Sequence, residues 1–141
     1  MKNKAKILRY DEIKIDSKCS FFRTITGDDV LKFSLLSGDL NPLHVNDEFG
    51  NNSRFGKNIV HGMLTASLFS TLVGMYCPGQ NSLYIGQTLK FKMPLFYDET
   101  VLVRGIVVRK VDALKIIIMS TEIFRDNDLI VTGEAQIQLM E

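Results

Sequence analysis

The middle of the chain has the apolar pattern of a buried helix. Between residues 62 and 76, apolar residues cover most of a helix's circumference, and the polar residues among them are small. This pattern predicts one long helix over 62–76 that is buried on nearly all sides. A Cys-Pro-Gly sequence at 77–79 follows, and proline with glycine at this position predicts that the helix stops there.

After residue 80 the pattern becomes that of β-strands. In residues 89–93 apolar side chains alternate with lysines, which predicts a strand with one buried and one solvated face. The segments 110–113 and 126–128 are the predicted turns between later strands. Because short turns join consecutive strands into antiparallel sheets, the sequence predicts an α+β fold whose sheet wraps the apolar helix. The later strands, rich in valine and isoleucine, are predicted over 101–108, 114–124 and 129–139.

The first half of the chain predicts a strand over 18–25 and then a short capped helix. Thr26 has the residue type of an N-cap, and Asp28 and Asp29 follow in the first turn, where the helix dipole favours anions. Gly38 is expected to end this helix. The segment after it is therefore a loop.

Composition limits the classes of partner. The 141 residues are enough for one domain, expected over 1–141 with a core of about 17–140. A formal net charge of +1 predicts neither nucleic acid nor a membrane surface as partner. The longest apolar stretch is too short and too polar to span a bilayer. Two distant cysteines, and an N-terminus without the apolar region of a signal peptide, predict a cytoplasmic location.

The loop after Gly38 concentrates acid–base groups. Asp39, Asn41 and His44 lie within six residues, and Pro42 restricts the backbone between them. Together Asp39 and His44 can hold a water molecule, accept its proton and deliver a proton to a substrate. The alternative is structural, since Asp39 can close a turn, Asn41 can form a turn before the proline, and His44 can pack.

The start of the predicted helix offers a second kind of chemistry. Gly62 has a backbone N–H at a helix start, which can bind a developing oxyanion, although a glycine here can also serve close packing. His61 is expected to be a structural, hydrogen-bonded histidine. Ser70, two turns into the helix, can be only a small packing residue.

Motifs for metals and nucleotides are absent from the sequence. Two histidines and two distant cysteines fit a catalytic zinc site poorly, and no HExxH motif occurs. The sequence also lacks GxSxG, a P-loop and GxGxxG. We therefore expect neither a metal nor a cofactor.

Taken together, these motifs resemble those of a known enzyme family. Residues 33–44 read FSLLSGDLNPLH, 59–63 read IVHGM, 84–87 read YIGQ and 131–135 read VTGEA. This pattern resembles the hydratase 2 motif of the R-specific enoyl-CoA hydratases, also called MaoC-like dehydratases. The resemblance implies a hot-dog fold, with a long central helix wrapped by an antiparallel sheet. It also implies a homodimer whose sheets join edge to edge, with an acyl thioester bound near the subunit interface.

The resemblance further implies a reaction and a set of roles. The reaction is the reversible addition of water to trans-2-enoyl-CoA, which gives (3R)-3-hydroxyacyl-CoA without a cofactor. Asp39 and His44 become the catalytic pair, Asn41 helps to place the water, and the N–H of Gly62 becomes the oxyanion donor. Ser70 matches a polar position near the site. The substrate pocket is expected along the central helix, lined by residues that include Leu68, Phe69 and Val73.

Three other functions stay open at this point. The same chemistry can act on a thioester of acyl carrier protein, in fatty acid synthesis. Hot-dog folds also hydrolyse thioesters, although the Asp-x-Asn-Pro-x-His arrangement argues against a thioesterase. A non-catalytic module that binds acyl thioesters is the third alternative, and the presence of both Asp39 and His44 argues against it.

Overall fold

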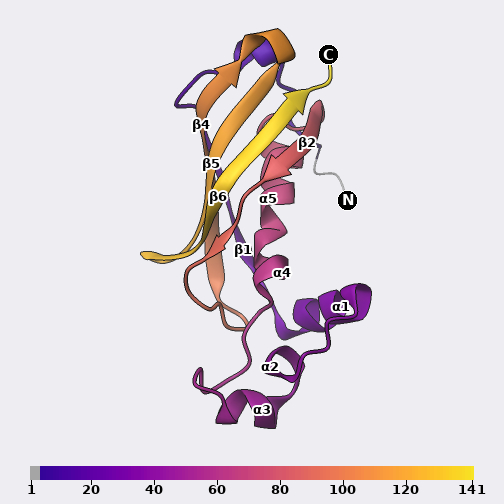
Figure 1. Cartoon of the computed structure of the whole chain (residues 1–141), viewed down its shortest axis with the longest axis vertical. Coiled ribbons are helices and arrows are strands. Elements are labelled where there is room, and N and C mark those ends of the chain that lie inside the picture. The colour runs from indigo at the N-terminus through magenta and orange to yellow at the C-terminus, as the bar shows by residue number, and fades with distance from the viewer. Residues whose placement is uncertain (1–3) are drawn as a thin grey trace.

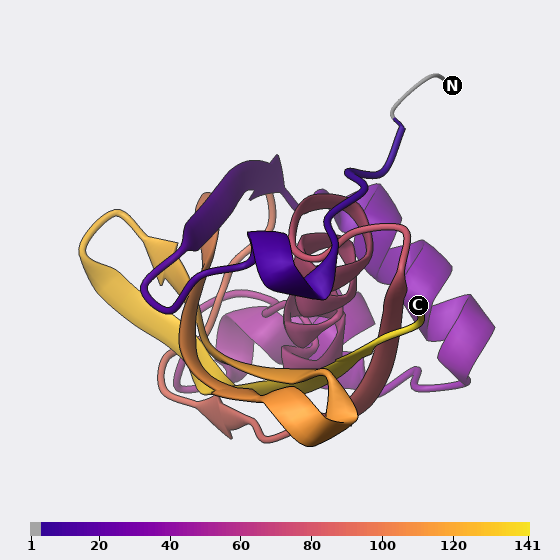
Figure 2. The ribbon, with the colours of Figure 1, turned by 90° about the horizontal axis from the view of Figure 1, so that it is seen from above.

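A curved antiparallel sheet wraps around one helical segment in the computed structural model, which describes residues 4–141 (Figure 1). Residues 1–3 lie outside the described residues. The expected lack of a signal peptide partly rests on them. The sheet order is β1-β4-β5-β6-β2, and β3 also pairs with β6. Seen from above, the sheet curves around the helix (Figure 2). The strands are β1 Lys18–Thr24, β2 Ser82–Gln87, β3 Lys90–Phe91, β4 Thr100–Val111, β5 Ile116–Arg125 and β6 Asp128–Leu139.

The central helix forms over the predicted residues in three consecutive pieces. These are α4 Gly62–Ala66, α5 Leu68–Thr71 and a π-helical turn over Leu72–Tyr76. The prediction that the helix is buried on nearly all sides is wrong. Met63 is 58% exposed, and Ser67 and Ser70 are exposed on the same side. The reason is that the sheet covers only one side of the helix.

The strands confirm the predicted antiparallel sheet but not all of its members. The three runs rich in valine and isoleucine lie in β4, β5 and β6. The strand predicted over 89–93 is present only as the two residues of β3, and its predicted buried face is wrong, because Phe91 is 51% exposed. After Phe91 the regular pairing ends: the N–H groups of Lys92 and Met93 both donate to the carbonyl oxygen of Ile130, and Pro94 has no N–H to donate. The pattern also missed β2, whose alternation is interrupted by a bulge between Tyr84 and Gly86.

Helix α1, Gly27–Ser37, has the predicted cap. The N–H of Asp29 donates to Oγ1 of Thr26 at 3.2 Å, and the N–H of Thr26 donates to Oδ2 of Asp29 at 3.0 Å. Gly38 ends the helix with φ 83°, as expected for a left-handed C-cap. Two shorter helices follow, α2 Pro42–Val45 and α3 Asp47–Asn52. The predicted loop after Gly38 is therefore wrong from Pro42 on, because Asn41 caps a short helix there. Figure 1 shows all three gathered at the end of the molecule where α4 begins.

A helix must be both long and apolar to cross a membrane. Within residues 4–141, no helix is both long enough and apolar enough to cross a membrane.

Candidate active site

The loop between α1 and α2 holds its shape through side chains of the predicted site. Oδ1 of Asp39 accepts the N–H of Asn41 at 3.2 Å, and Oδ1 of Asn41 accepts the N–H of Leu43 at 3.0 Å. Asn41 is thus the N-cap of α2. The structural roles considered for Asp39 and Asn41 are therefore present. They leave Oδ2 of Asp39 and the amide NH2 of Asn41 available to other partners.

Asn58 anchors α2 from outside the loop, and no local pattern in the sequence predicts this role. Its side-chain amide donates to the carbonyl oxygens of Pro42 at 3.3 Å, Leu43 at 2.9 Å and Asn46 at 2.9 Å. Asn58 itself is 7% exposed. Three backbone acceptors on one buried amide fix the short helix that carries His44.

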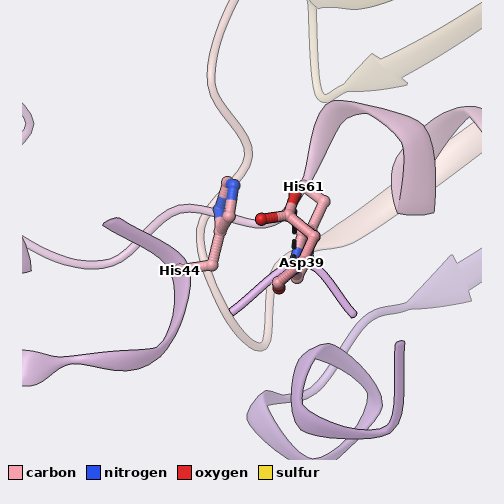
Figure 3. A group of neighbouring side chains, drawn as sticks. All are labelled: Asp39, His44 and His61. Atoms are coloured by element: carbon pink, nitrogen blue, oxygen red, sulfur yellow. Dashed lines mark hydrogen bonds and ion pairs between the residues drawn. The ribbon is translucent and has the colours of Figure 1, made fainter. Parts of the chain in front are cut away.

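Asp39, His44 and His61 meet in one cluster (Figure 3). The rings of His44 and His61 stack with centroids 3.9 Å apart. Nε2 of His61 lies 4.0 Å from Oδ2 of Asp39, whose side chain is 51% exposed. The structure therefore brings together the two predicted acid–base residues. His61 was expected to be structural and hydrogen-bonded; this is confirmed, and the residue also contacts both members of the pair.

Hydrogen bonds to carbonyl groups define where each imidazole carries its proton. Nδ1 of His44 bonds the carbonyl oxygen of Ile59 at 2.8 Å, and Nε2 of His61 bonds that of Asp39 at 3.1 Å. A carbonyl only accepts, so each of these nitrogens carries a hydrogen. In its neutral form His44 therefore has a lone pair at Nε2. Burial lowers the pKa of His61 below its ordinary value, and the nearby His44 lowers it further.

These three residues also form the group, within the described part of the chain, whose side chains could hold a metal ion. Their potential ligand atoms lie within 4.8 Å of one another. A metal ligand must offer a lone pair, but Nε2 of His61 donates its hydrogen to Asp39. The arrangement fits proton transfer better than metal binding.

Gly62 lines a cavity of about 430 Å³, to which none of the three cluster residues contributes. Phe55 and Phe91 are among its apolar lining residues, with Arg54 and Lys92 among its basic ones. A Cβ built on Gly62 would lie 2.9 Å from ring carbons of Phe91, so the close-packing role considered for this glycine is real. Its backbone N–H is at the first position of α4, where no partner within the helix exists.

The predicted pocket residues on the central helix have different surroundings. Leu68 lines a second cavity of about 420 Å³, between α1 and the central helix. Phe69 and Val73 are each 1% exposed, in the core that packs against the sheet. Ser70 is exposed on the open side of the helix. In the single chain, therefore, Phe69, Val73 and Ser70 line neither cavity.

Known proteins with similar sequences fit this architecture. The family model described as MaoC like domain matches residues 12–124. The chain is also 38% identical to the (R)-specific enoyl-CoA hydratase of Aeromonas caviae over 128 residues, which cover 90% of this chain and 96% of that protein. The chain belongs to the MaoC-like family.

Further comparisons place this MaoC-like protein among hydratases and dehydratases. It is 38% identical to a mitochondrial 3-hydroxyacyl-[acyl-carrier-protein] dehydratase of Solanum lycopersicum, over 90% of this chain and 78% of that protein. The solved structure of the unliganded R-hydratase of Pseudomonas aeruginosa has a TM-score of 0.91 at 30% identity, covering 97% of this chain and 88% of that chain. The predicted hot-dog fold is thus confirmed.

Proposed function

We propose that this MaoC-like enzyme adds water reversibly to trans-2-enoyl-CoA and forms (3R)-3-hydroxyacyl-CoA. The observation that carries the proposal is the cluster of Asp39 and His44 beside the first residue of α4. It occurs in a chain whose similarity to an (R)-specific enoyl-CoA hydratase extends over 96% of that protein.

The reaction needs one proton removed from water and one returned to carbon. In our proposal the Asp39 and His44 pair removes a proton from water as its oxygen bonds to C3, and a proton is added at C2. The lone pair of His44 Nε2 and the half-exposed carboxylate of Asp39 are the two groups suited to this exchange. The amide NH2 of Asn41 orients the water, since its oxygen already caps α2.

The thioester oxygen gains negative charge as water attacks. We propose that it accepts the N–H of Gly62, at the positive end of the central helix. Loss of one such donor typically costs about 10²–10³ in rate. The first-turn N–H of Gly62 is suited to this role because it has no partner within the helix.

Hydration of crotonyl-CoA tests the proposal, followed by the loss of its enoyl absorbance. We expect turnover with a 3R product, and a fall in kcat of about 10²–10⁴ in Asp39→Asn. Asp28→Asn is the matched control, because Asp28 is an exposed carboxylate whose partner is Lys32. A 3S product, or equal rates for Asp39→Asn and Asp28→Asn, would contradict the proposal.

A second candidate substrate is a thioester of acyl carrier protein. The similarity to a 3-hydroxyacyl-[acyl-carrier-protein] dehydratase, at 38% identity, favours it specifically. Comparing kcat/KM for crotonyl-CoA and for crotonyl-acyl carrier protein decides between the two carriers. Release of a free thiol without hydration would instead indicate a thioesterase, and binding without turnover a non-catalytic module.

We also propose that the acyl chain runs along the central helix. Leu68 contacts it from the second cavity and Ser70 from the open side, while Phe69 and Val73 support the helix from the core. Leu68→Ala is expected to raise kcat/KM for eight-carbon relative to four-carbon enoyl-CoA, because it enlarges the cavity. An unchanged ratio would argue against this path.

Finally, we propose a homodimer and a cytoplasmic location. Strand β2 is at an edge of the sheet, where Leu83 is 46% and Ile85 is 45% exposed. An exposed edge strand with apolar side chains favours pairing with another strand. A second copy joined there would also approach the open side of the central helix, near Ser70. Both cysteines are free thiols, which suits a reducing compartment.

A further inference from the structure

Two buried polar side chains lie behind the catalytic loop, and the proposed reaction gives them no role. Ser34 is 0% and His61 is 2% exposed. Oγ of Ser34 and Nε2 of His61 are 3.1 Å apart, in the contact between α1 and the start of α4. Burying polar groups costs free energy unless they are hydrogen-bonded, so packing alone would favour apolar residues here.

The hydrogen bonds of His61 lead from this buried pair to the main chain of Asp39. Its Nε2–H donates to the carbonyl oxygen of Asp39 at 3.1 Å. The bond therefore constrains the backbone that directs the Asp39 carboxylate, rather than neutralising that carboxylate. Because the side chain of Asp39 is half exposed, its direction depends strongly on how this backbone is held.

The ring of His61 also fixes the second member of the pair. It stacks on the ring of His44, with an angle of 27° between the planes, and meets the ring of Phe33 edge-on. Nδ1 of His44 is already bonded to Ile59. One face contact and one hydrogen bond together define the direction in which Nε2 of His44 points.

We propose that His61, held by Ser34, is a positioning residue for hydration: it sets the backbone of Asp39 and the ring of His44 without touching the substrate. This inference rests on the proposed function. It requires His61 to stay neutral with its hydrogen on Nε2. Nδ1 of His61 is buried and has no hydrogen-bond partner among residues 4–141, so a proton there would be an unpaired donor.

Three substitutions separate positioning from simple packing. His61→Phe keeps an aromatic ring and removes the donor, and we expect kcat to fall about 10–100-fold with KM within about threefold. His61→Gln keeps an N–H near the position of Nε2 and should be at least about threefold faster than His61→Phe. Ser34→Ala should lower kcat about 2–10-fold.

Thr121→Val is the matched control, because Thr121 is a 0% exposed hydroxyl on β5 that bonds Gln87 instead of the loop. It should lose thermal stability and keep kcat within about twofold. Wild-type kcat in folded His61→Phe, a change confined to KM, or equal loss in the Phe and Gln variants would overturn the inference. Absence of turnover in the wild type would instead overturn the proposed function.

A spectroscopic test needs no turnover. The sequence has two histidines, so nitrogen-15 imidazole spectra of the untagged protein contain two rings, and His61→Gln assigns them. We expect His61 to be the neutral Nε2–H tautomer at pH 8 and to gain a proton only at a lower pH than an ordinary histidine does. A hydrogen on Nδ1, or titration with an ordinary histidine pKa, would overturn the inference even if His61→Phe were inactive.

Discussion

Single residues of this site combine a structural contact with a chemical one. Asn41 caps α2 with its oxygen and keeps its NH2 available, and Asp39 accepts a backbone N–H with one oxygen and faces His61 with the other. Carboxylates and amides allow this because each presents several hydrogen-bonding positions. Structural and catalytic explanations for Asp39 and Asn41 are therefore compatible.

At the residue scale, His61 should make stability depend on pH. Burial keeps its pKa below the value of about 6.5 of an unfolded histidine. Below that pH the unfolded chain binds a proton that the folded protein does not, so the free energy of unfolding falls as pH falls. In urea unfolding, we expect the wild type to lose more unfolding free energy than His61→Gln as the pH falls from 7.5 to 5.5. Parallel pH curves for the two proteins would contradict this.

Gly62 gives a second prediction at this scale. In Gly62→Ala the new methyl group meets the ring of Phe91, which is half exposed and can move. We expect a loss of about 1–3 kcal/mol in unfolding free energy, largely relieved in the double variant Gly62→Ala/Phe91→Ala. A double-mutant cycle in urea measures the coupling. Additive effects would mean that the two residues do not interact.

At the scale of elements, one short helix depends on a side chain far from it in sequence. Helix α2 carries His44 but has only four residues, too few to be stable by itself. Asn58 supplies the missing support through three carbonyl groups, and the hydroxyl of Tyr97 donates to the carbonyl of His44. The position of His44 therefore depends on how other elements pack against α2.

Asn58→Ala tests this dependence. The substitution removes the buried amide and leaves several carbonyl groups unpaired. We therefore expect the free energy of unfolding to fall by about 2–4 kcal/mol, and kcat for hydration to fall as well. Asn51→Ala, at an exposed asparagine of α3, is the control and should change neither. Equal stability of the two variants in urea would show that Asn58 does not anchor α2.

At the scale of the whole molecule, the two edges of the sheet should behave differently. Ile85→Lys, on β2, places a charge at the proposed dimer contact. Phe22→Lys, on β1 at the opposite edge, changes a side chain that is 72% exposed and serves as the control. We expect light scattering to find monomers for Ile85→Lys and dimers for Phe22→Lys. The reverse result would move the contact to β1, and a monomeric wild type would exclude the dimer.

Local sequence determined the elements whose signals are local. The central helix, the cap of α1, strands β4 to β6 and the acid–base loop all follow from hydrophobic period, capping residues and proline. Those patterns act over a few residues, where a side chain competes with its own backbone. Asp39 and His44 could also be predicted, because they lie close together in one short segment, although His44 is in α2 and not in the loop.

Only the tertiary structure decided the rest. The pairing of β2, the exposure of Phe91, the anchoring by Asn58 and the contact of His61 with Asp39 all join segments that are distant in sequence. No local pattern encodes such contacts, since each depends on how the sheet curves and on how α1 and α2 contact His61 at the start of α4. The same geometry leaves one side of an apolar helix open, because a single curved sheet covers only the other.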